Sequence, residues 1–230
     1  MHVTTVTPLA ADSGPPIFQW KWVDRNADDI VQRLVEHISL TATALGIGLL
    51  VSIGLALVAL RFRRTYGFIL STTGALYVIP SLGAFAVLRP FFGLTFTTAV
   101  IPLATYTLLI LVRNIVTGID QVPSEVRKAA TGMGFTRRRM LWQVELPLAL
   151  PVVIAGLRVA AVTTIGLVTV TSMLGLGGLG YFIRHGIQNS TPNSTEIIVG
   201  MALSVVLAVA VDLVLWLGER LLTPWTRRVR

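Results

Sequence analysis

The sequence predicts an all-α membrane protein that crosses the bilayer five times. Hydrophobic residues make up 53% of its 230 residues and charged residues only 13%, and the mean hydropathy is +0.75, unlike a soluble globular composition. Apolar runs recur that are long enough to cross about 30 Å of hydrocarbon. Basic residues are divided unequally between the segments that would lie on the two sides of the membrane. These three observations indicate an integral membrane protein.

The composition also excludes several classes of site. The net charge of +8 is typical of a basic excess on one side of a membrane, and no nucleic-acid-binding motif accompanies it. The chain has no cysteine, so disulfides and thiolate metal sites are not possible. The histidines, His2, His37 and His185, are scattered and lie outside the predicted spans. We expect no metal, no cofactor and no nucleic acid partner.

Residues 1–37 are predicted to form an extracytoplasmic segment. Its polar beginning has no basic region ahead of an apolar run, so an ordinary signal peptide is not expected. Residues 27–37 can form a short amphipathic helix with Ile30 and Leu34 on its apolar side. We expect this helix to lie on the outer surface of the membrane.

A transmembrane domain is predicted over residues 38–222, with spans at residues 38–60, 66–88, 94–112, 151–174 and 197–217. Pro80 and Ser81 lie near the middle of the second span and interrupt its backbone hydrogen bonding, so a neighbouring helix or a wet cavity must satisfy the freed groups. A wall of a transport path and a structural kink explain this interruption equally well. The third span is predicted to stop at Arg113, and residues 175–192 to form a flexible outer loop.

The distribution of lysine and arginine predicts the orientation. If the charged segment at residues 123–147 is cytoplasmic, only five of the 19 basic residues remain outside: Lys21, Arg25, Arg33, Arg89 and Arg184. The positive-inside bias then places the N-terminus outside and the C-terminus, with a basic tail at residues 223–230, in the cytoplasm.

The segment at residues 123–147 is the longest charged stretch between apolar runs, and it is predicted to be a cytoplasmic docking loop. Pro123 begins a helix-start signal. The helix that follows is predicted to end at Gly132 and Gly134.

A second short helix is predicted in the same loop. Thr136 can cap it, and Pro147 and Pro151 are predicted to redirect the chain into the membrane afterwards. Two short helices with a small turn between them suit insertion into a groove on another protein.

This loop resembles the signature loop of ABC-importer permeases, the binding-protein-dependent transport inner-membrane components. The family motif is Glu-Ala-Ala, three residues, Gly, nine residues, an aliphatic residue, one residue and Leu-Pro. The matching positions are Lys128, Ala129, Ala130, Gly134, Val144, Leu146 and Pro147. Lys128 departs from the motif's acidic residue, although Glu125 lies one turn earlier on a similar face. The stretches LPLALPVVIAGLR and GLGGLGYFIRHGIQ and the last span are similar to the osmoprotectant branch, and the resemblance covers the chain from about His37 onward.

The resemblance implies the methionine-importer-like permease fold of type I ABC importers. The chain would form half of the translocation path for a quaternary ammonium osmoprotectant such as glycine betaine, choline or carnitine. Implied partners are two cytoplasmic ABC ATPase subunits, a second copy of this chain or a related permease, an extracytoplasmic solute-binding protein and the bilayer of a bacterial inner membrane. Methionine importers have similar permeases, so a methionine or other amino-acid substrate is the alternative.

Energy must then come from a partner, because the chain has no phosphate-binding loop: neither lysine belongs to a Gly-Lys-Ser/Thr sequence. ATP and Mg would be bound by the partner ATPase, and no catalysis is expected here. The expected coupling residues are Glu125, Lys128, Ala129, Ala130, Thr131, Gly132, Met133, Gly134, Phe135, Thr136, Arg137, Val144, Leu146 and Pro147. Arg137, Arg138 and Arg139 have an alternative role as an anchor on anionic lipid.

Two groups of residues inside the spans are candidates for function. Aromatic faces attract quaternary ammonium groups, and hydroxyl groups give a mildly polar lining. The candidate path residues are Tyr77, Pro80, Ser81, Phe85, Thr105, Tyr106, Thr169 and Ser172. Arg158 and Asp212 are the clear intramembrane charges, and we expect them to pair because an unpaired charge at the centre of a span costs about 2.5–3.5 kcal/mol. Either a clamp between helices or a moving gate would use this pair.

Two other classes of protein fit these residues less well than a transport subunit does. A membrane enzyme would need clustered carboxylates, histidines or a metal at membrane depth, and a passive channel would have no use for the docking loop. The glycines at positions 175, 177 and 180 match a dinucleotide-binding pattern, but they follow a membrane span and lack a βαβ unit, so we interpret them as a tight turn in the outer loop.

Overall fold

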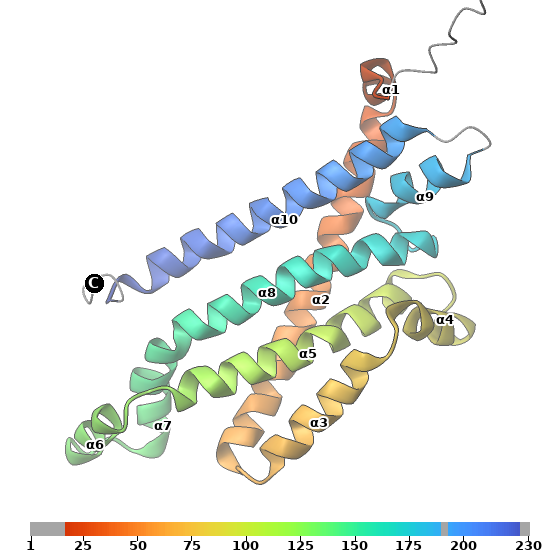
Figure 1. The fold of residues 1–230 in the computed structure, drawn as a ribbon. Coiled ribbons are helices and arrows are strands. Elements are labelled where there is room, and N and C mark those ends of the chain that lie inside the picture. Colours follow the sequence, from red (N-terminus) through yellow and green to blue (C-terminus); the bar gives the residue numbers. More distant parts are fainter. Residues whose placement is uncertain (1–16, 190–192, 226–230) are drawn as a thin grey trace, which may run out of the picture.

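A computed structural model describes residues 17–189 and 193–225, in which the regular secondary structure is helical (Figure 1). The basic tail predicted at residues 223–230 lies mostly outside this part of the chain, as do residues 1–16 of the predicted extracytoplasmic segment. The elements in chain order are α1 (Trp20–Arg25), α2 (Ala27–Arg61), α3 (Thr65–Val78), α4 (Ser81–Phe92), α5 (Phe96–Asp120), α6 (Ser124–Gly132), α7 (Arg137–Met140), the π-helical turn η1 (Leu141–Glu145), α8 (Leu146–Met173), α9 (Gly180–Gln188) and α10 (Ser194–Leu222).

The predicted surface helix at residues 27–37 is wrong as a separate element, because it is the first part of the first transmembrane helix. Helix α2 continues through His37 for 35 residues, roughly 52 Å at 1.5 Å per residue. No glycine or proline interrupts residues 27–45, and His37 is buried against the protein. The first helix therefore extends well beyond the about 30 Å of a hydrocarbon core.

The predicted second span is broken into two helices. Helices α3 and α4 meet at Ile79 and Pro80 with a bend of 87°, and α3 has only 14 residues, roughly 21 Å. Pro80 cannot donate a backbone hydrogen bond and disfavours helical conformation in the residue before it. Among residues 17–189 and 193–225, four single helices are long and apolar enough to cross a membrane, and the bent pair raises the number to five if it counts as one span.

The helices on both sides of the docking loop extend beyond the predicted spans. The span predicted to stop at Arg113 belongs to helix α5, which continues to Asp120. Pro147 and Pro151 do not break the helix, since α7, η1 and α8 form a continuous helical segment at residues 137–173. Pro147 lies in the first turn of α8, where a missing N–H is tolerated.

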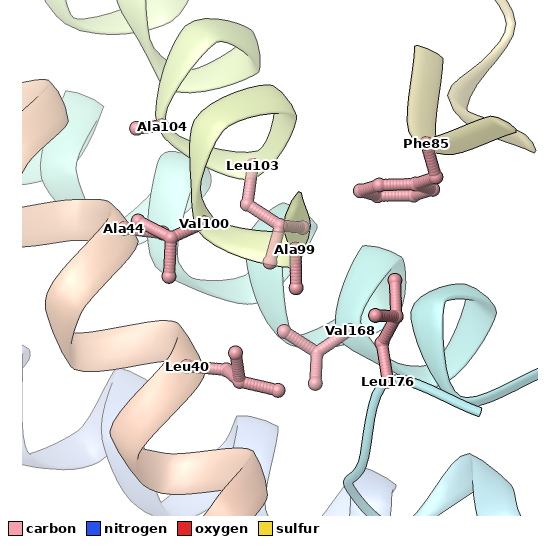
Figure 2. Close-up of a cluster of buried hydrophobic side chains, with 9 residues drawn as sticks. All are labelled: Leu40, Ala44, Phe85, Ala99, Val100, Leu103, Ala104, Val168 and Leu176. Carbon is pink, nitrogen blue, oxygen red and sulfur yellow. The ribbon is translucent and has the colours of Figure 1, made fainter. Parts of the chain in front are cut away.

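Helix α5 lies at the centre of the structure and packs against α2, α8 and α3. A cluster of buried apolar side chains joins α2, α4, α5, α8 and the loop after α8; its residues are Leu40, Ala44, Phe85, Ala99, Val100, Leu103, Ala104, Val168 and Leu176 (Figure 2). Small residues let the helices approach each other closely: a side chain at Gly48 would collide with Thr107, and one at Gly156 with Asn114. These contacts hold the helices that carry the candidate residues.

The two ends of the helical assembly differ in structure. Helices α1, α4 and α9 lie toward one end, and α6, α7, the α2–α3 turn and the end of α10 lie toward the other (Figure 1). The predicted outer loop is not simply flexible, because it contains α9, which packs against α8 and α10. Gly175 and Gly177 do form the expected tight turn, with φ of +82° and +86°, a conformation that favours glycine.

Candidate coupling loop and transport path

The first helix of the docking loop, α6, begins and ends as its sequence predicts. It starts at Ser124, directly after Pro123. The pKa of Glu125 lies below its ordinary value because its carboxylate accepts a hydrogen bond from its own backbone N–H and one of 2.9 Å from the Ser124 hydroxyl. At the other end the N–H of Phe135 donates to the carbonyl of Ala130 at 3.1 Å.

The turn after α6 is a Schellman motif centred on Gly134. The N–H of Gly134 donates to the carbonyl of Thr131 at 2.9 Å, and Gly134 has φ of +79°, the left-handed conformation that such a motif needs. Met133 projects from this turn with 69% of its surface exposed. The coupling residues that the sequence places here are exposed except for Ala130, which is buried, and Phe135, which is half-buried. Lys128 is also exposed.

Arg127 connects the first leg of the loop, which is α6, with the second leg, which is α7 and η1. The sequence did not predict this contact. Its guanidinium donates to the carbonyl of Ile119 at the end of α5 at 2.5 Å, and its Nε lies 2.8 Å from Oε1 of Glu145 in η1, close enough for an ion pair although the angle is poor for a hydrogen bond. Because the partners are far apart in sequence, no local pattern predicts this contact.

The second leg begins with the predicted cap. The hydroxyl of Thr136 accepts a hydrogen bond from the N–H of Arg139 at 3.3 Å, and the Arg139 guanidinium lies 4.4 Å from the centre of the Phe135 ring. The remaining motif residues, Val144, Leu146 and Pro147, lie in η1 and the first turn of α8 and are half-buried. The motif therefore covers the exposed turn and the helical connection back to the membrane.

Four of the eight candidate path residues line one cavity of about 270 Å³: Tyr77, Pro80, Ser81 and Tyr106. The cavity lies where α3 and α4 break, beside α5 and α8. The rings of Tyr77 and Tyr106 meet edge to face at 6.0 Å. The Tyr106 hydroxyl donates to the carbonyl of Ile79 at 2.9 Å, so a neighbouring helix satisfies one backbone group at the break, as predicted. Thr163 of α8 also lines the cavity and was missed, since nothing in the local sequence distinguishes it.

The other four candidates do not line this cavity. Phe85 is 1% exposed and packs in the apolar cluster of Figure 2. Ser172 is buried, and its hydroxyl bonds to backbone carbonyls of Val168 and Gly177. Thr169 bonds to its own helix, and Thr105 lines a neighbouring, mainly apolar cavity of about 440 Å³. Phe85 and Ser172 therefore belong to the core of the chain, because aromatic and hydroxyl side chains pack inside helical bundles as readily as they line a path.

Arg158 and Asp212 pair as the sequence predicts. The guanidinium of Arg158 in α8 donates to both carboxylate oxygens of Asp212 in α10, at 2.8 and 2.7 Å. Glu219 of α10, which was not singled out, lies 3.7 Å from the same guanidinium. Its position seven residues after Asp212, two turns along the same face, is the signal that would have found it. The arrangement is a three-residue network between two long helices.

A second set of polar contacts joins α2 to α8 and to the turn before α9. His37 is 0% exposed; its Nδ1 accepts a hydrogen bond from the N–H of Leu179 at 3.3 Å, and its Nε2 lies 3.1 Å from the carbonyl of Ile165. Nε2 therefore carries the proton, because Nδ1 acts as an acceptor. Glu36 accepts a hydrogen bond of 3.1 Å from the N–H of Gly178. Helix α2 is thus bound to the turn before α9.

Within the described residues, no group of three or more His, Cys, Asp or Glu side chains is placed to hold a metal ion. Several acidic groups of the long helices are engaged in ion pairs or hydrogen bonds, such as those of Glu36 with Gln32 and of Glu196 with Asn193.

Curated proteins with similar sequences are permeases of osmoprotectant transport systems. The choline transport system permease protein OpuBB of Bacillus subtilis is 34% identical over 89% of this chain and 93% of its own length. The glycine betaine/carnitine/choline transport system permease protein OpuCD of the same organism is 34% identical, covering 88% of each chain. The osmoprotectant import permease protein OsmW of Salmonella typhimurium is 33% identical over 86% of this chain and 94% of its own length.

Solved structures of ABC importers share the fold at low sequence identity. An amino acid ABC transporter solved with histidines superposes with a TM-score of 0.74 at 20% identity, covering 88% of this chain and 98% of that one. The MetNI methionine ABC transporter, in an inward-facing conformation, gives a TM-score of 0.72 at 19% identity, covering 90% of this chain and 100% of that one. The fold is therefore that of type I ABC-importer permeases, as the sequence predicts.

The sequence family described as binding-protein-dependent transport system inner membrane component matches residues 47–228, which include the docking loop and all later helices. With the exposed turn at Gly134, the broken second span and the relatives just described, this match is decisive: the chain belongs to the family of binding-protein-dependent transport system inner membrane components.

Proposed function

We propose that this chain is the transmembrane subunit of an ATP-driven importer in a bacterial inner membrane and that it forms half of the path for a quaternary ammonium osmoprotectant. The names of the relatives, which transport choline, glycine betaine or carnitine, support this class of solute. The observation that carries the proposal is the cavity at the α3–α4 break, because its chemistry suits such a solute.

The cavity offers aromatic faces and hydroxyl groups without a charged side chain. Tyr77 and Tyr106 supply rings that attract a trimethylammonium group. Ser81 and Thr163 supply hydroxyl donors for a carboxylate or hydroxyl at the other end of the solute. No charged residue is among the described residues that line it. A methionine or other amino-acid substrate would bring a primary ammonium group, which usually needs an anionic or carbonyl partner, so the cavity favours the quaternary amine.

The coupling loop would connect this path to ATP hydrolysis. Two cytoplasmic ATPase subunits, each engaging one copy of the exposed turn at residues 131–137, would move a pair of permease subunits by rigid-body rotation and alternate access to the cavity. An extracytoplasmic binding protein would deliver the solute at the end that carries α1 and α9. The second permease would be another copy of this chain or a related one. The chain itself would hydrolyse no ATP and bind neither ATP nor Mg.

The test is ATP-dependent uptake into liposomes that contain this chain with its ATPase and binding-protein partners. Radiolabelled glycine betaine, choline, carnitine and methionine are compared with ATP or a non-hydrolysable analogue inside. We expect uptake of at least one quaternary amine and none of methionine. Uptake of methionine alone would keep the importer and overturn the solute, and no ATP-dependent uptake of any solute would count against the importer.

The cavity has its own test. Tyr77→Leu removes one ring face, and we expect it to raise the KM for the quaternary amine roughly fivefold to thirtyfold, since a cation–π contact is worth about 1–2 kcal/mol. Tyr77→Phe keeps a ring and should retain most of the affinity. Equal KM values for the leucine and phenylalanine variants would show that the cavity is not the solute site.

A further inference from the structure

A cavity lies at the base of the coupling loop, outside the candidate transport path. It has a volume of about 580 Å³ and is formed where the end of α2, the end of α5, α6, α7 and η1 meet. Its lining contains the arginines Arg61, Arg63, Arg127, Arg137 and Arg138. The positive-inside bias assigns this end of the molecule to the cytoplasm.

Two of these arginines are already neutralised. Arg63 donates to both oxygens of Asp120, at 2.9 and 2.6 Å, and these hydrogen bonds raise its pKa. Arg127 forms the ion pair with Glu145. Both pairs fix the walls of the cavity and add no net charge to it.

The other three arginines keep their charge uncompensated. Within the described residues, neither Arg61, Arg137 nor Arg138 has an acidic partner. Arg137 donates to the carbonyl of Leu60 at 3.3 Å, which holds it at the cavity without neutralising it. Three arginines without acidic partners that line one cavity favour an anion with several oxygen acceptors, since the planar guanidinium matches phosphate geometry.

The rest of the lining is apolar and belongs to the ends of the membrane-spanning helices. Leu57 and Leu60 lie in the last turns of α2, Ile119 lies in the last turn of α5, and Leu141 begins η1 beside Met140. Leu57 is 40% exposed. The cavity therefore has a cationic part at the water-facing end and an apolar part that continues toward the hydrocarbon.

We propose that this cavity binds the headgroup phosphate of an anionic phospholipid, with the first part of an acyl chain along the apolar wall. Basic pockets between transmembrane helices on the cytoplasmic side suit such headgroups. An acidic surface of the ATPase would satisfy the arginines but would leave Leu57, Leu60 and Ile119 without an apolar partner. The bound lipid would lie against both legs of the coupling loop, beside and not on the turn at Gly134.

The experiment measures binding of a fluorescent phosphatidylglycerol to the purified full-length chain in a neutral detergent. Arg61→Gln and Arg138→Gln each remove one uncompensated charge, and each should weaken binding about fivefold, from roughly 1 kcal/mol per basic residue. Arg139→Gln is the matched control, because this arginine follows Arg138 directly but is not part of the cavity lining. It should weaken binding less than twofold. Arg61→Lys and Arg138→Lys keep the charge and should keep most of the affinity, which separates loss of the site from misfolding.

Competition identifies the source of the phosphate. Unlabelled phosphatidylglycerol should displace the probe, whereas phosphatidylcholine and glycerol 3-phosphate at equal concentration should not. The proposal is overturned if the control Arg139→Gln weakens binding as much as Arg138→Gln, since the attraction would then be diffuse. It is also overturned if glycerol 3-phosphate competes as well as the lipid, which would mean a free phosphate site. A third contradicting result is unchanged lipid binding by Arg61→Gln and Arg138→Gln with reduced capture of the ATPase, which would make the cavity part of the ATPase interface.

Discussion

Individual side chains form the polar contacts between helices that are distant in sequence, and the network of Arg158 is the clearest example. The guanidinium holds Asp212 through two hydrogen bonds and approaches Glu219 within 3.7 Å. A charge that loses its partner at membrane depth becomes costly, whereas removing both charges together avoids that cost. The three residues should therefore act as one unit.

Replacing Asp212 with Asn should lower the amount of assembled, active transporter, and adding Arg158→Gln should restore part of it. Transport rate and yield of the complex, measured for both single variants and the double variant, give the coupling. Independent losses that multiply in the double variant would contradict the pairing. Glu219→Gln should have a smaller effect than Asp212→Asn, because its distance to the guanidinium is longer.

His37 should stabilise the structure through two hydrogen bonds to the backbone. His37→Leu leaves the Leu179 N–H without this partner, at about 1–3 kcal/mol for a buried group. The Ile165 carbonyl loses its bond to His37 but still accepts one from the Thr169 hydroxyl. Ser52→Ala is the control, because the Ser52 hydroxyl is buried in α2 without a hydrogen-bond partner in the described part of the chain. Thermal unfolding of the purified protein should show a clear drop for His37→Leu and none for Ser52→Ala; equal drops would contradict this role.

For single residues, the sequence predicts some roles and misses others, and the difference has a physical reason. Arg158 and Asp212 could be found because charges are rare in apolar spans. His37 looked like a surface residue, since its role depends on a backbone carbonyl more than a hundred positions away. Phe85 has the right chemistry for the path but points into the core. The type of a residue limits the contacts that its side chain can make, and the fold determines which of these contacts form.

The elements depend on a few glycines, and Gly134 controls the turn of the coupling loop. Its φ of +79° costs about 1–2 kcal/mol for a residue with a Cβ. Gly67 in α3 lies outside the coupling loop and faces open space. Gly134→Ala should reduce ATP-dependent uptake while Gly67→Ala leaves it nearly unchanged; equal effects of the two variants would show that the Schellman turn does not set the coupling geometry.

Helix α9 is held against α8 through Gly180. A side chain there would collide with the carbonyl of Thr169 and lie 2.9 Å from Cβ of Ser172, an overpacking that costs about 1–3 kcal/mol. Gly166 in α8 faces open space. Thermal unfolding should therefore show Gly180→Ala destabilised and Gly166→Ala unchanged or slightly stabilised, because alanine favours a helix over glycine. If Gly180→Ala is as stable as the native chain, α9 is not packed in this way.

The long apolar elements were visible in the sequence, but their ends were not. A helix continues wherever its backbone can bond, so α5 passes Arg113 and α2 begins before the apolar run. The short helices of the coupling loop were predicted well, because Thr136 and Gly134 act through neighbours a few residues away. The 87° bend at Pro80 could be expected as an interruption, but its angle depends on contacts of α4 with α5 and α8.

In the whole molecule, three regions with different structures follow one another along the helices. The end with α1 and α9 is held together by Glu36 and His37, the middle contains the uncharged cavity, and the arginine-rich end carries the coupling loop. We expect motion at the loop to reach the cavity because η1 and α8 form a continuous helical segment with α7. The central claim is that the turn at Gly134 contacts a separate ATPase.

Site-specific cross-linking tests this claim most directly. The chain has no cysteine, so Met133→Cys places a single thiol on the exposed turn, and Met173→Cys places one at the opposite end of α8, where 48% of the side chain is exposed. In membranes that contain the assembled complex, a thiol-reactive cross-linker should join Met133→Cys to the ATPase and leave Met173→Cys uncoupled. An intact, transporting complex in which Met133→Cys does not cross-link, or cross-links no better than Met173→Cys, would contradict the account.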